Sequence, residues 1–375
     1  MNSRQPQQAQ IQMSFPLQLA PSMQDMLSSA TLAMNEAVAA RRAAGQETIH
    51  LGFGEASFPL HPLLRGALNA AAGQTGYAPV PGIAALRQAI ADYLTRTRHL
   101  ETTAASIAVG PGSKPLIYTL LHILEGDLLL PAPSWVSYAP HARLAGKQII
   151  GVATDDSDHH RLTPQALDDA LERARGQGAD TRILIVNTPS NPTGGMFARA
   201  DVEALATWCR AHGITLISDE IYAELAHGWR EHISPAIFYP EGCIVTGGLS
   251  KAFSAGGWRL GYAALPGGEA GARLMNALRA LASEIWSSAT TPVQAAAVVA
   301  YTNHPDLERY VQRAARLHGY VAHQLYETLI TLGALCPRPA GGFYLYPDFA
   351  PWRSQLAALN IHTSDDLARY LLDTW

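Results

Sequence analysis

The chain has 375 residues, with 27 basic against 31 acidic side chains and a formal net charge of −4. Its composition, 48% hydrophobic and 15% charged, is typical of a globular protein of about two domains and excludes a largely disordered chain. Charges of one sign form no blocks, unlike a surface that neutralises the phosphates of a nucleic acid. We therefore expect no nucleic acid partner.

Three cysteines, Cys209, Cys243 and Cys336, lie far apart in the sequence and form neither a C-x-x-C pair nor a disulfide framework. The N-terminus lacks the apolar stretch of a secretory signal. No segment reaches the ~18 consecutive apolar residues that a membrane span needs. The expected protein is cytoplasmic, has free thiols and has no membrane partner.

Residues 1–20 are rich in Gln and Pro and predict a flexible arm. Beyond them, segments of helical periodicity alternate with short apolar segments that are rich in β-branched residues. Expected helices cover 83–97, the segment around Leu116 to Leu124, and 164–175 after the N-cap Thr163. Expected strands cover 107–109, 128–130, 149–152, 183–186, 214–217, 244–246 and 260–264. This alternation predicts an α/β fold with a mostly parallel sheet covered by helices on both faces.

From about residue 293 the alternation gives way to helical periodicity up to Leu335, and a strand is expected at 341–346. We interpret this change as the hinge into a second, smaller domain. The predicted organisation is a small α+β domain from both chain ends, 21–62 and 300–375, and a large domain at 63–299.

Polar motifs follow four of the expected strands, at the sheet edge where ligands of open parallel sheets bind. The first is Gly110-Pro-Gly-Ser-Lys114, which enters a helix and offers free backbone N–H groups to an anion. The second is the loop 187–195, in which two residues precede prolines and stiffen the backbone around Asn191. Singly, each of these motifs is more often structural, as in a simple turn, than functional.

The other two motifs carry charged side chains. Asp219 and Tyr222 follow the strand at 214–217, and Ser250-Lys251 follows the strand at 244–246, with Arg259 eight residues further on. Taken alone, Asp219 could cap a helix, Lys251 could be solvated, and Arg259 could pair with a carboxylate.

Together, the order of these four motifs resembles the fold-type I pyridoxal 5′-phosphate (PLP) enzymes, specifically the class I/II aminotransferases. The resemblance covers roughly residues 28–375. It implies that Lys251 holds PLP through a Schiff base and carries a proton during catalysis. It also implies that Asp219 pairs with the pyridine nitrogen, while Asn191 and Tyr222 donate hydrogen bonds to the phenolic oxygen of the cofactor.

The same resemblance implies the remaining contacts of the cofactor. Trp135 matches the aromatic residue stacked on its ring, with packing in the core or at an interface as the alternative. Tyr77 resembles the tyrosine that reaches the phosphate from a neighbouring subunit, which implies a homodimer with shared sites. Gly54 lies in a loop similar to the one near the substrate carboxylate, where Asn191 is also expected. The expected phosphate-binding residues are Gly112, Ser113, Lys114, Ser250 and Arg259.

The largest departure from the family lies at the C-terminus. Relatives continue past a helix like 365–372, through a further strand, to an arginine that binds the substrate's α-carboxylate, whereas this sequence ends at Trp375. Either the chain is a fragment, or another segment or chain supplies that cation, or the substrate lacks the carboxylate. An incomplete small domain is expected to have an unpaired edge, a partly covered helix, and low stability or a tendency to aggregate.

The function that the resemblance implies is a PLP-dependent aminotransferase that moves an amino group from an amino acid to a 2-oxo acid. The alternatives are a PLP-dependent lyase or cyclase, a PLP-binding sensor domain, and a truncated inactive paralogue. No metal site is expected, because His159-His160 among nearby aspartates is better explained as a solvated loop. The segment 52–57 lacks the third glycine of a dinucleotide fingerprint.

Overall fold

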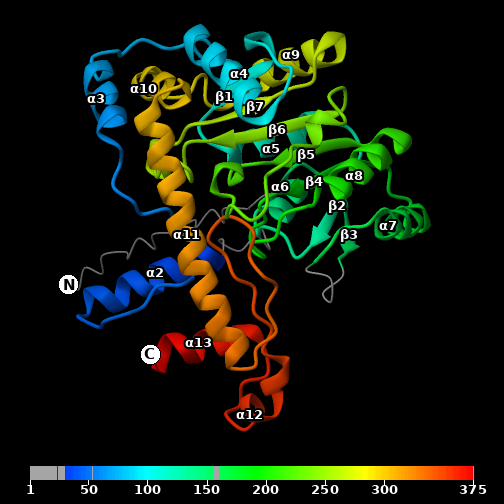
Figure 1. The fold of residues 1–375 in the computed structure, drawn as a ribbon. Coiled ribbons are helices and arrows are strands. Elements are labelled where there is room, and N and C mark those ends of the chain that lie inside the picture. Colours follow the sequence, from blue (N-terminus) through cyan, green and yellow to red (C-terminus); the bar gives the residue numbers. More distant parts are fainter. Residues whose placement is uncertain (1–22, 24–29, 53, 155–159, 375) are drawn as a thin grey trace, which may run out of the picture.

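The computed structural model describes residues 23, 30–52, 54–154 and 160–374 (Figure 1). The expected arm at 1–20 and most of the loop around His159 lie outside the described residues.

A seven-stranded sheet lies at the centre of the larger part of the molecule, with the strand order β1-β7-β6-β5-β4-β2-β3 (Figure 1). All seven strands that the sequence predicts between residues 107 and 264 are present. Strands β3, β2, β4, β5 and β6 pair in parallel. The strands are β1 (Ile107–Gly110), β2 (Asp127–Ala132), β3 (Ile149–Ala153), β4 (Thr181–Asn187), β5 (Thr215–Asp219), β6 (Cys243–Gly248) and β7 (Gly261–Ala264).

Strand β7 is the exception to the parallel pattern, since it runs antiparallel to both β1 and β6. A parallel return needs a crossover of a dozen or more residues, usually a helix. Between β6 and β7 the chain has only a loop with the short 3₁₀ helix η5 (Gly256–Trp258). The chain therefore turns back beside β6 and holds the Lys251 loop at this edge of the sheet.

Helices cover both faces of the sheet, as the sequence predicts. Within β4, Leu184 and Val186 join one hydrophobic core and Ile183 and Ile185 the other, because successive side chains of a strand point to opposite faces. The first core packs against α3 (Pro62–Ala71), α4 (Ala84–Arg98), α7 (Pro164–Gly176), α8 (Arg199–His212) and α10 (Thr291–Tyr301). The second packs against α5 (Ser113–Ile123), α6 (Tyr138–Leu144) and α9 (Gly268–Ile285).

Local signals place the helix ends close to where the sequence predicts them. Helix α7 begins after Thr163, whose hydroxyl accepts the N–H of Ala166 at 3.2 Å and so satisfies a free donor of the first turn. Helix α4 ends at Arg98, one residue beyond the expected end, with His99 in the left-handed conformation.

The C-terminal part is built around α11 (Pro305–Thr331), which leaves the sheet region and runs to the lower end of the molecule (Figure 1). The N-terminal α2 (Ala30–Ala43) and the C-terminal α13 (Ser364–Thr374) lie there together, and Arg41 reaches Asp373 at 3.3 Å. The short α12 (Arg353–Ala357) lies between α11 and α13 in the chain.

The strand expected at 341–346 is wrong. In its place are isolated bridges, Ala226 to Gly341 and Leu335 to Asp348. The neighbours of this segment are loops, and Gly341-Gly342 is a weak strand former. Its backbone groups bond to the loops after β4 and β5 instead, which brings the segment to the carboxyl edge of the sheet.

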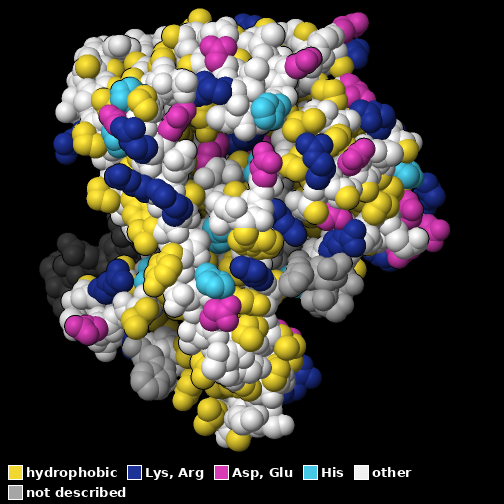
Figure 2. Space-filling view, viewed as in Figure 1, with side chains coloured by type: hydrophobic (Ala, Val, Ile, Leu, Met, Phe, Trp, Pro, Cys, Tyr) yellow, Lys and Arg dark blue, Asp and Glu magenta, His cyan; other side chains and the backbone are white. Residues whose placement is uncertain are grey.

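The surface carries acidic and basic side chains interspersed over the larger part, while apolar side chains gather lower in the view, where α11, α12 and α13 lie (Figure 2). Tyr320, Leu335 and Leu359 are 64%, 58% and 54% exposed there. Cys209, Cys243 and Cys336 are free thiols. None of the helices in the described ranges is long and apolar enough to cross a membrane.

Candidate active site

The carboxyl ends of β4, β5 and β6 lie side by side and carry the predicted polar residues. Asn187 pairs with Asp219, and Asp219 with Thr246, along the ladder. The amine of Lys251, just beyond β6, lies 5.5 Å from the centre of the Tyr222 ring. Tyr222 and Asn191 in turn share a hydrogen-bond partner. The structure therefore brings Asn191, Asp219, Tyr222 and Lys251 to one edge of the sheet.

Lys251 lies in a partly buried position, where its Nζ donates a hydrogen bond to the carbonyl oxygen of Gly54 at 2.6 Å. Burial lowers the pKa of Lys251 to about 8, even though the charges of Glu55 and Asp219 act to raise it. A substantial fraction of such an amine is neutral near physiological pH. A neutral amine at the end of a strand is equipped to attack a carbonyl group.

Asp219 is the last residue of β5, and its carboxyl group is fully buried. Burial raises the pKa of Asp219 to about 6, although hydrogen bonds from neighbours lower it. Tyr138 donates its O–H to Oδ2 at 2.7 Å, and Thr246 donates to Oδ1 at 3.2 Å. A buried carboxylate of this kind is suited to a cationic partner, which would stabilise its charged form.

An anion cradle lies at the start of α5. Gly112 is the N-cap of this helix with φ +103°, and a Cβ there would lie 2.6 Å from Nη2 of Arg259. Glycine is therefore what allows the guanidinium to approach the free N–H groups of Ser113 and Lys114. A guanidinium beside a helix N-terminus is an arrangement that binds phosphate.

Ser250 and Arg259 come from the two ends of the loop between β6 and β7. Ser250 precedes Lys251, and Arg259 follows η5 with its Nη1 donating to the carbonyl of Gly256 at 2.8 Å. A Cβ at Gly256 would lie 3.7 Å from the Ser250 carbonyl oxygen, so the turn folds back on itself. The fold of this loop brings the chain around Ser250 back towards Arg259.

Trp135 lies between the cradle and the buried acid. Its ring meets Tyr138 edge-on, with the ring centres 5.1 Å apart, and the Lys114 amine lies 5.0 Å from the centre of the Trp135 ring. Trp135 also packs against the second hydrophobic core, in line with the alternative considered for it.

Two residues of this cleft are missed by sequence reasoning. Tyr344 lies 2.7 Å from the Tyr222 hydroxyl, oxygen to oxygen, and accepts a hydrogen bond from Nδ2 of Asn191 at 3.1 Å. Tyr138 holds the Asp219 carboxyl group. The available signals were Tyr138 standing three residues after Trp135, and Tyr344 following a Gly-Gly pair.

A buried ionic network surrounds Glu220, the residue after Asp219. The Glu220 carboxylate, next to Asp219 in the chain, accepts hydrogen bonds from Arg98 at 2.8 Å and Ser234 at 2.5 Å and bonds to His232 at 3.0 Å. Burial alone would raise the pKa of Glu220, but His232 and Arg98 hold it at about 2. The network neutralises Glu220 and fixes the chain just past β5.

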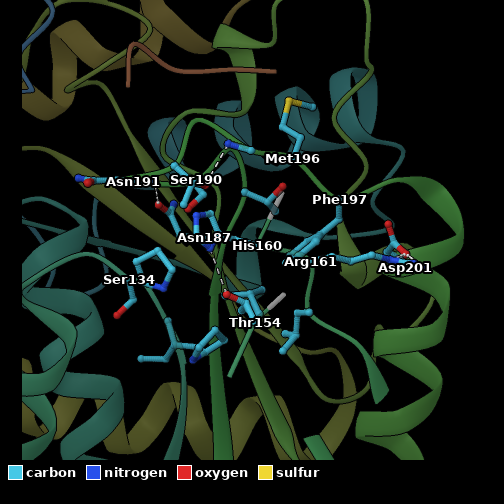
Figure 3. A pocket seen from close by; sticks show the side chains of 18 of the residues that line it. Ser134, Thr154, His160, Arg161, Asn187, Ser190, Asn191, Met196, Phe197 and Asp201 are labelled. Atoms are coloured by element: carbon cyan, nitrogen blue, oxygen red, sulfur yellow. Dashed lines mark hydrogen bonds and ion pairs between the residues drawn. The ribbon is translucent and has the colours of Figure 1, made fainter. Parts of the chain in front are cut away.

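A pocket of about 370 Å³ adjoins Asn191 (Figure 3). Asn187, at the end of β4, and Ser190 and Asn191, in the loop after it, line one side of the pocket, while Arg161, paired with Asp201 at 2.7 Å, lies on its other side. Ser134 and Tyr138 also line this pocket, so it lies next to the cleft with Asp219.

Among the predicted site residues, Tyr77 is the one that does not lie at the cleft around Lys251. It lies between α3 and α4 and is 93% exposed. Across the described ranges, no group of His, Cys, Asp and Glu side chains is arranged to hold a metal ion.

Comparison with known proteins agrees with this geometry. The family model "Aminotransferase class I and II" matches residues 46–375. Aspartate aminotransferase of Geobacillus stearothermophilus is 34% identical over 367 residues, 95% of this chain and 89% of that protein. Aspartate/prephenate aminotransferase of Thermus thermophilus is 32% identical over 338 residues, 89% and 85% of the two chains.

The solved structures include aspartate aminotransferase from Thermus thermophilus with maleate. It matches with a TM-score of 0.83 and 30% identity, over 96% of this chain and 98% of that one. The resemblance of the four motifs to the class I/II aminotransferases is thus confirmed, and the fold is that of aspartate aminotransferase. The chain therefore belongs to the class I and II aminotransferase family and is a PLP-dependent aminotransferase.

Proposed function

We propose that this aminotransferase takes the amino group of an acidic amino acid, with aspartate as the first candidate, and passes it to a 2-oxo acid at the cleft around Lys251. The observation that carries this proposal is the convergence of a lysine amine, a buried carboxyl group and an anion cradle. The relatives named above act on aspartate by name, and one of them is described with maleate, a dicarboxylate.

The residues of the cleft fit PLP. The cradle at Gly112 has a guanidinium and free N–H groups for the phosphate, and the buried Asp219 suits a protonated ring nitrogen. Lys251 provides an amine with a lowered pKa for the aldehyde. When bound, PLP supplies an electron sink that stabilises negative charge on the α-carbon of the substrate.

In the proposed chemistry, each side chain has a defined task. Lys251 holds the cofactor and, once the substrate's amino group has displaced it, moves the proton at the substrate's α-carbon. Asp219 keeps the ring nitrogen protonated. Asn191 and Tyr222 donate hydrogen bonds to the phenolic oxygen of PLP, which favours its ionised form. Gly54 and Asn191 border the space for the substrate's carboxylate.

The remaining contacts hold the cofactor in position. Trp135 would stack on its ring. The proposed phosphate-binding residues are Gly112, Ser113, Lys114, Ser250 and Arg259.

Lys114 is the residue that we assign to the second carboxylate of an acidic substrate. Arg259 is committed to the phosphate and Lys251 to the aldehyde. Of the cations that line the adjoining pocket, Arg161 is paired with Asp201 and Arg230 donates to the carbonyl of Met196. The Lys114 amine lies over the Trp135 ring. Because only its backbone N–H is needed by the phosphate, its side chain is available to the substrate.

Lys114→Met should raise the KM for aspartate by about tenfold or more, the cost of a lost hydrogen bond between charged groups. The KM for a neutral donor such as phenylalanine should change little. The measurement is steady-state kinetics with 2-oxoglutarate, whose consumption must equal the aspartate consumed. Lys114→Arg, which keeps the charge, is the matched control. Equal loss with both donors would show that Lys114 does not select the substrate.

A homodimer with shared sites is also proposed. Tyr77 is 93% exposed, and Ile49 and Leu51 are 83% and 81% exposed, so apolar side chains stand free on the N-terminal third of the chain. The proposed dimer directs Tyr77 to the phosphate in the partner's site.

Light scattering should give the holoenzyme a mass of twice that of one chain. Tyr77→Phe should raise the dissociation constant of PLP about tenfold at unchanged mass, because one hydrogen bond to the charged phosphate is lost. Tyr320→Phe, the same change at another exposed tyrosine, should leave PLP binding unaltered. A monomeric mass with full activity would refute the shared site.

We also propose the division into two domains that the sequence predicts. Residues 21–62 and 300–375 together form the small domain, and residues 63–299 form the large, PLP-binding domain. The ion pair between Arg41 of α2 and Asp373 of α13 supports a small domain made from both chain ends.

A further inference from the structure

The segment 339–344 is tied by its backbone to both loops that carry the proposed donors to PLP. On one side, the N–H groups of Ala340 and Gly341 donate to the carbonyl of Gly194, at 2.7 and 3.1 Å, in the loop of Asn191. On the other side, the N–H of Gly342 donates to the carbonyl of Leu225 at 3.0 Å, three residues past Tyr222. The segment thus crosses from one donor loop to the other.

His227 strengthens the same link through its backbone and its side chain. Its backbone N–H donates to the carbonyl of Ala340 at 2.8 Å, and its ring bonds to the carbonyl of Gly342 at 2.9 Å. A Cβ at Gly341 would lie 2.5 Å from Cγ of Pro189, so only glycine permits this approach. The backbone just before Tyr344 is therefore held in one position.

The Tyr344 hydroxyl then lies between the two donor side chains. It accepts from Nδ2 of Asn191 at 3.1 Å and lies 2.7 Å from the Tyr222 hydroxyl. A Cβ on Gly54, whose carbonyl holds Lys251, would overlap this hydroxyl. Burial raises the pKa of Tyr344 to about 12, so its proton stays in place at neutral pH.

The protons of this triad can be accounted for one by one. Asn191 has two N–H donors on Nδ2, and one goes to Tyr344. Each phenol has one O–H donor and can accept as well. If Tyr344 donates to Tyr222, then Tyr222 keeps its own O–H, and Asn191 keeps its second N–H. The Asn191 side chain also lies within hydrogen-bond reach of the Tyr222 hydroxyl. Both remaining donors can then turn to one further acceptor that lies beside the pair.

We infer that Tyr344 is a positioning residue. Its hydroxyl holds Asn191 and Tyr222 so that each presents its remaining donor to the phenolic oxygen of PLP. The inference rests on the proposed function, since it assumes that PLP lies beside these two side chains. A phenol that accepts one hydrogen bond also becomes a stronger donor of the next, so Tyr344 acts on the cofactor through Tyr222.

The test is a pH titration of the visible absorbance of PLP in the full-length holoenzyme. Tyr344→Phe should raise the midpoint by about one pH unit, because weaker donors favour the ionised oxygen less. The dissociation constant of PLP should rise about three- to tenfold, as expected for a lost hydrogen bond. Replacing Tyr344 by 3-fluorotyrosine keeps the shape and makes a stronger donor, so the midpoint should fall.

Two comparisons separate positioning from a merely structural role. Tyr346→Phe, the same change at a more exposed tyrosine two residues beyond Tyr344, should leave the midpoint where it is. In a Tyr222→Phe background, Tyr344→Phe should shift the midpoint much less than it does alone, because the two act in series.

Other outcomes would overturn the inference. An unchanged midpoint in both Tyr344 variants excludes the relay through Tyr222. Tighter PLP binding by Tyr344→Phe would mean that the hydroxyl competes for the cofactor's place. A different result would refute the proposed function itself: borohydride reduction of the wild-type holoenzyme that does not fix PLP on Lys251.

Discussion

Lys251→Ala is expected to abolish the covalent retention of PLP and to lower kcat by roughly 10²- to 10⁴-fold, the range that positioned proton transfer contributes. The amine has two proposed tasks, and alanine removes both. Wild-type holoenzyme reduced with borohydride should keep PLP through denaturation, and peptide mapping should locate it on residue 251. Reduced Lys251→Ala should release all of it.

The chain makes this mapping decisive, because Lys114, Lys147 and Lys251 are its three lysines. Lys147 serves as the control, since its amine bonds to the carbonyls of Leu124 and Gly126 in a turn at the start of β2. Lys147→Met should retain PLP and activity. Label on either of the other lysines would show that the assignment of Lys251 is wrong.

The pH dependence of the same step follows from burial of the amine. Only the neutral amine attacks an aldehyde, and burial lowers the pKa of Lys251 to about 8. The rate at which cofactor-free protein captures PLP should therefore rise with pH and level off above a midpoint near 8. A midpoint above 10, the range of a solvated lysine, would mean that the amine is not buried when PLP arrives.

Asp219→Ala should weaken PLP binding by roughly tenfold or more and reduce kcat by roughly 10²- to 10³-fold, the cost of losing one preorganised electrostatic partner. If Asp219 pairs with the ring nitrogen as proposed, removing the carboxylate would let the nitrogen lose its proton, and the ring would stabilise negative charge poorly. Fluorescence titration with PLP and single-turnover kinetics would measure the two effects separately.

Matched variants test whether the loss of kcat in Asp219→Ala comes from the lost negative charge. Asp219→Asn keeps the size and some of the contacts to Tyr138 and Thr246 but lacks the charge, so it should resemble Asp219→Ala in kcat. Asp180→Ala removes a carboxylate that pairs with Arg182 at the surface and should have little effect. Near-normal turnover in Asp219→Asn would refute the proposed role of Asp219.

Much of the sheet and of the helices that cover it could be predicted from the sequence because the signals for them are local. Short apolar runs such as Ile183 to Val186 are bounded by polar or glycine residues. Thr163 caps the helix that follows it by accepting the N–H of Ala166, only three residues further along the chain. The direction of β7 could not be read in this way, since it depends on the absence of a crossover helix. The segment at 341–346 is rich in aromatic residues but has no strand beside it.

The residues of the candidate site could likewise be predicted only where a local motif marks them. Lys251, Asp219 and Arg259 stand in motifs whose order along the chain resembles a family. Tyr344 and Tyr138 carry no such signal, because their partners Tyr222 and Asp219 lie 122 and 81 residues away in the sequence. Which phenol reaches which acid or amide is decided by packing between distant segments.

The backbone link at 339–344 limits how the molecule can move. Hydrogen bonds join this segment to the loops of Asn191 and Tyr222, so those loops and the segment must travel as a single unit. If the C-terminal part opens and closes over a substrate, its hinge on this side has to lie beyond Tyr344. The donors to the cofactor would then stay fixed while the helices α12 and α13 swing.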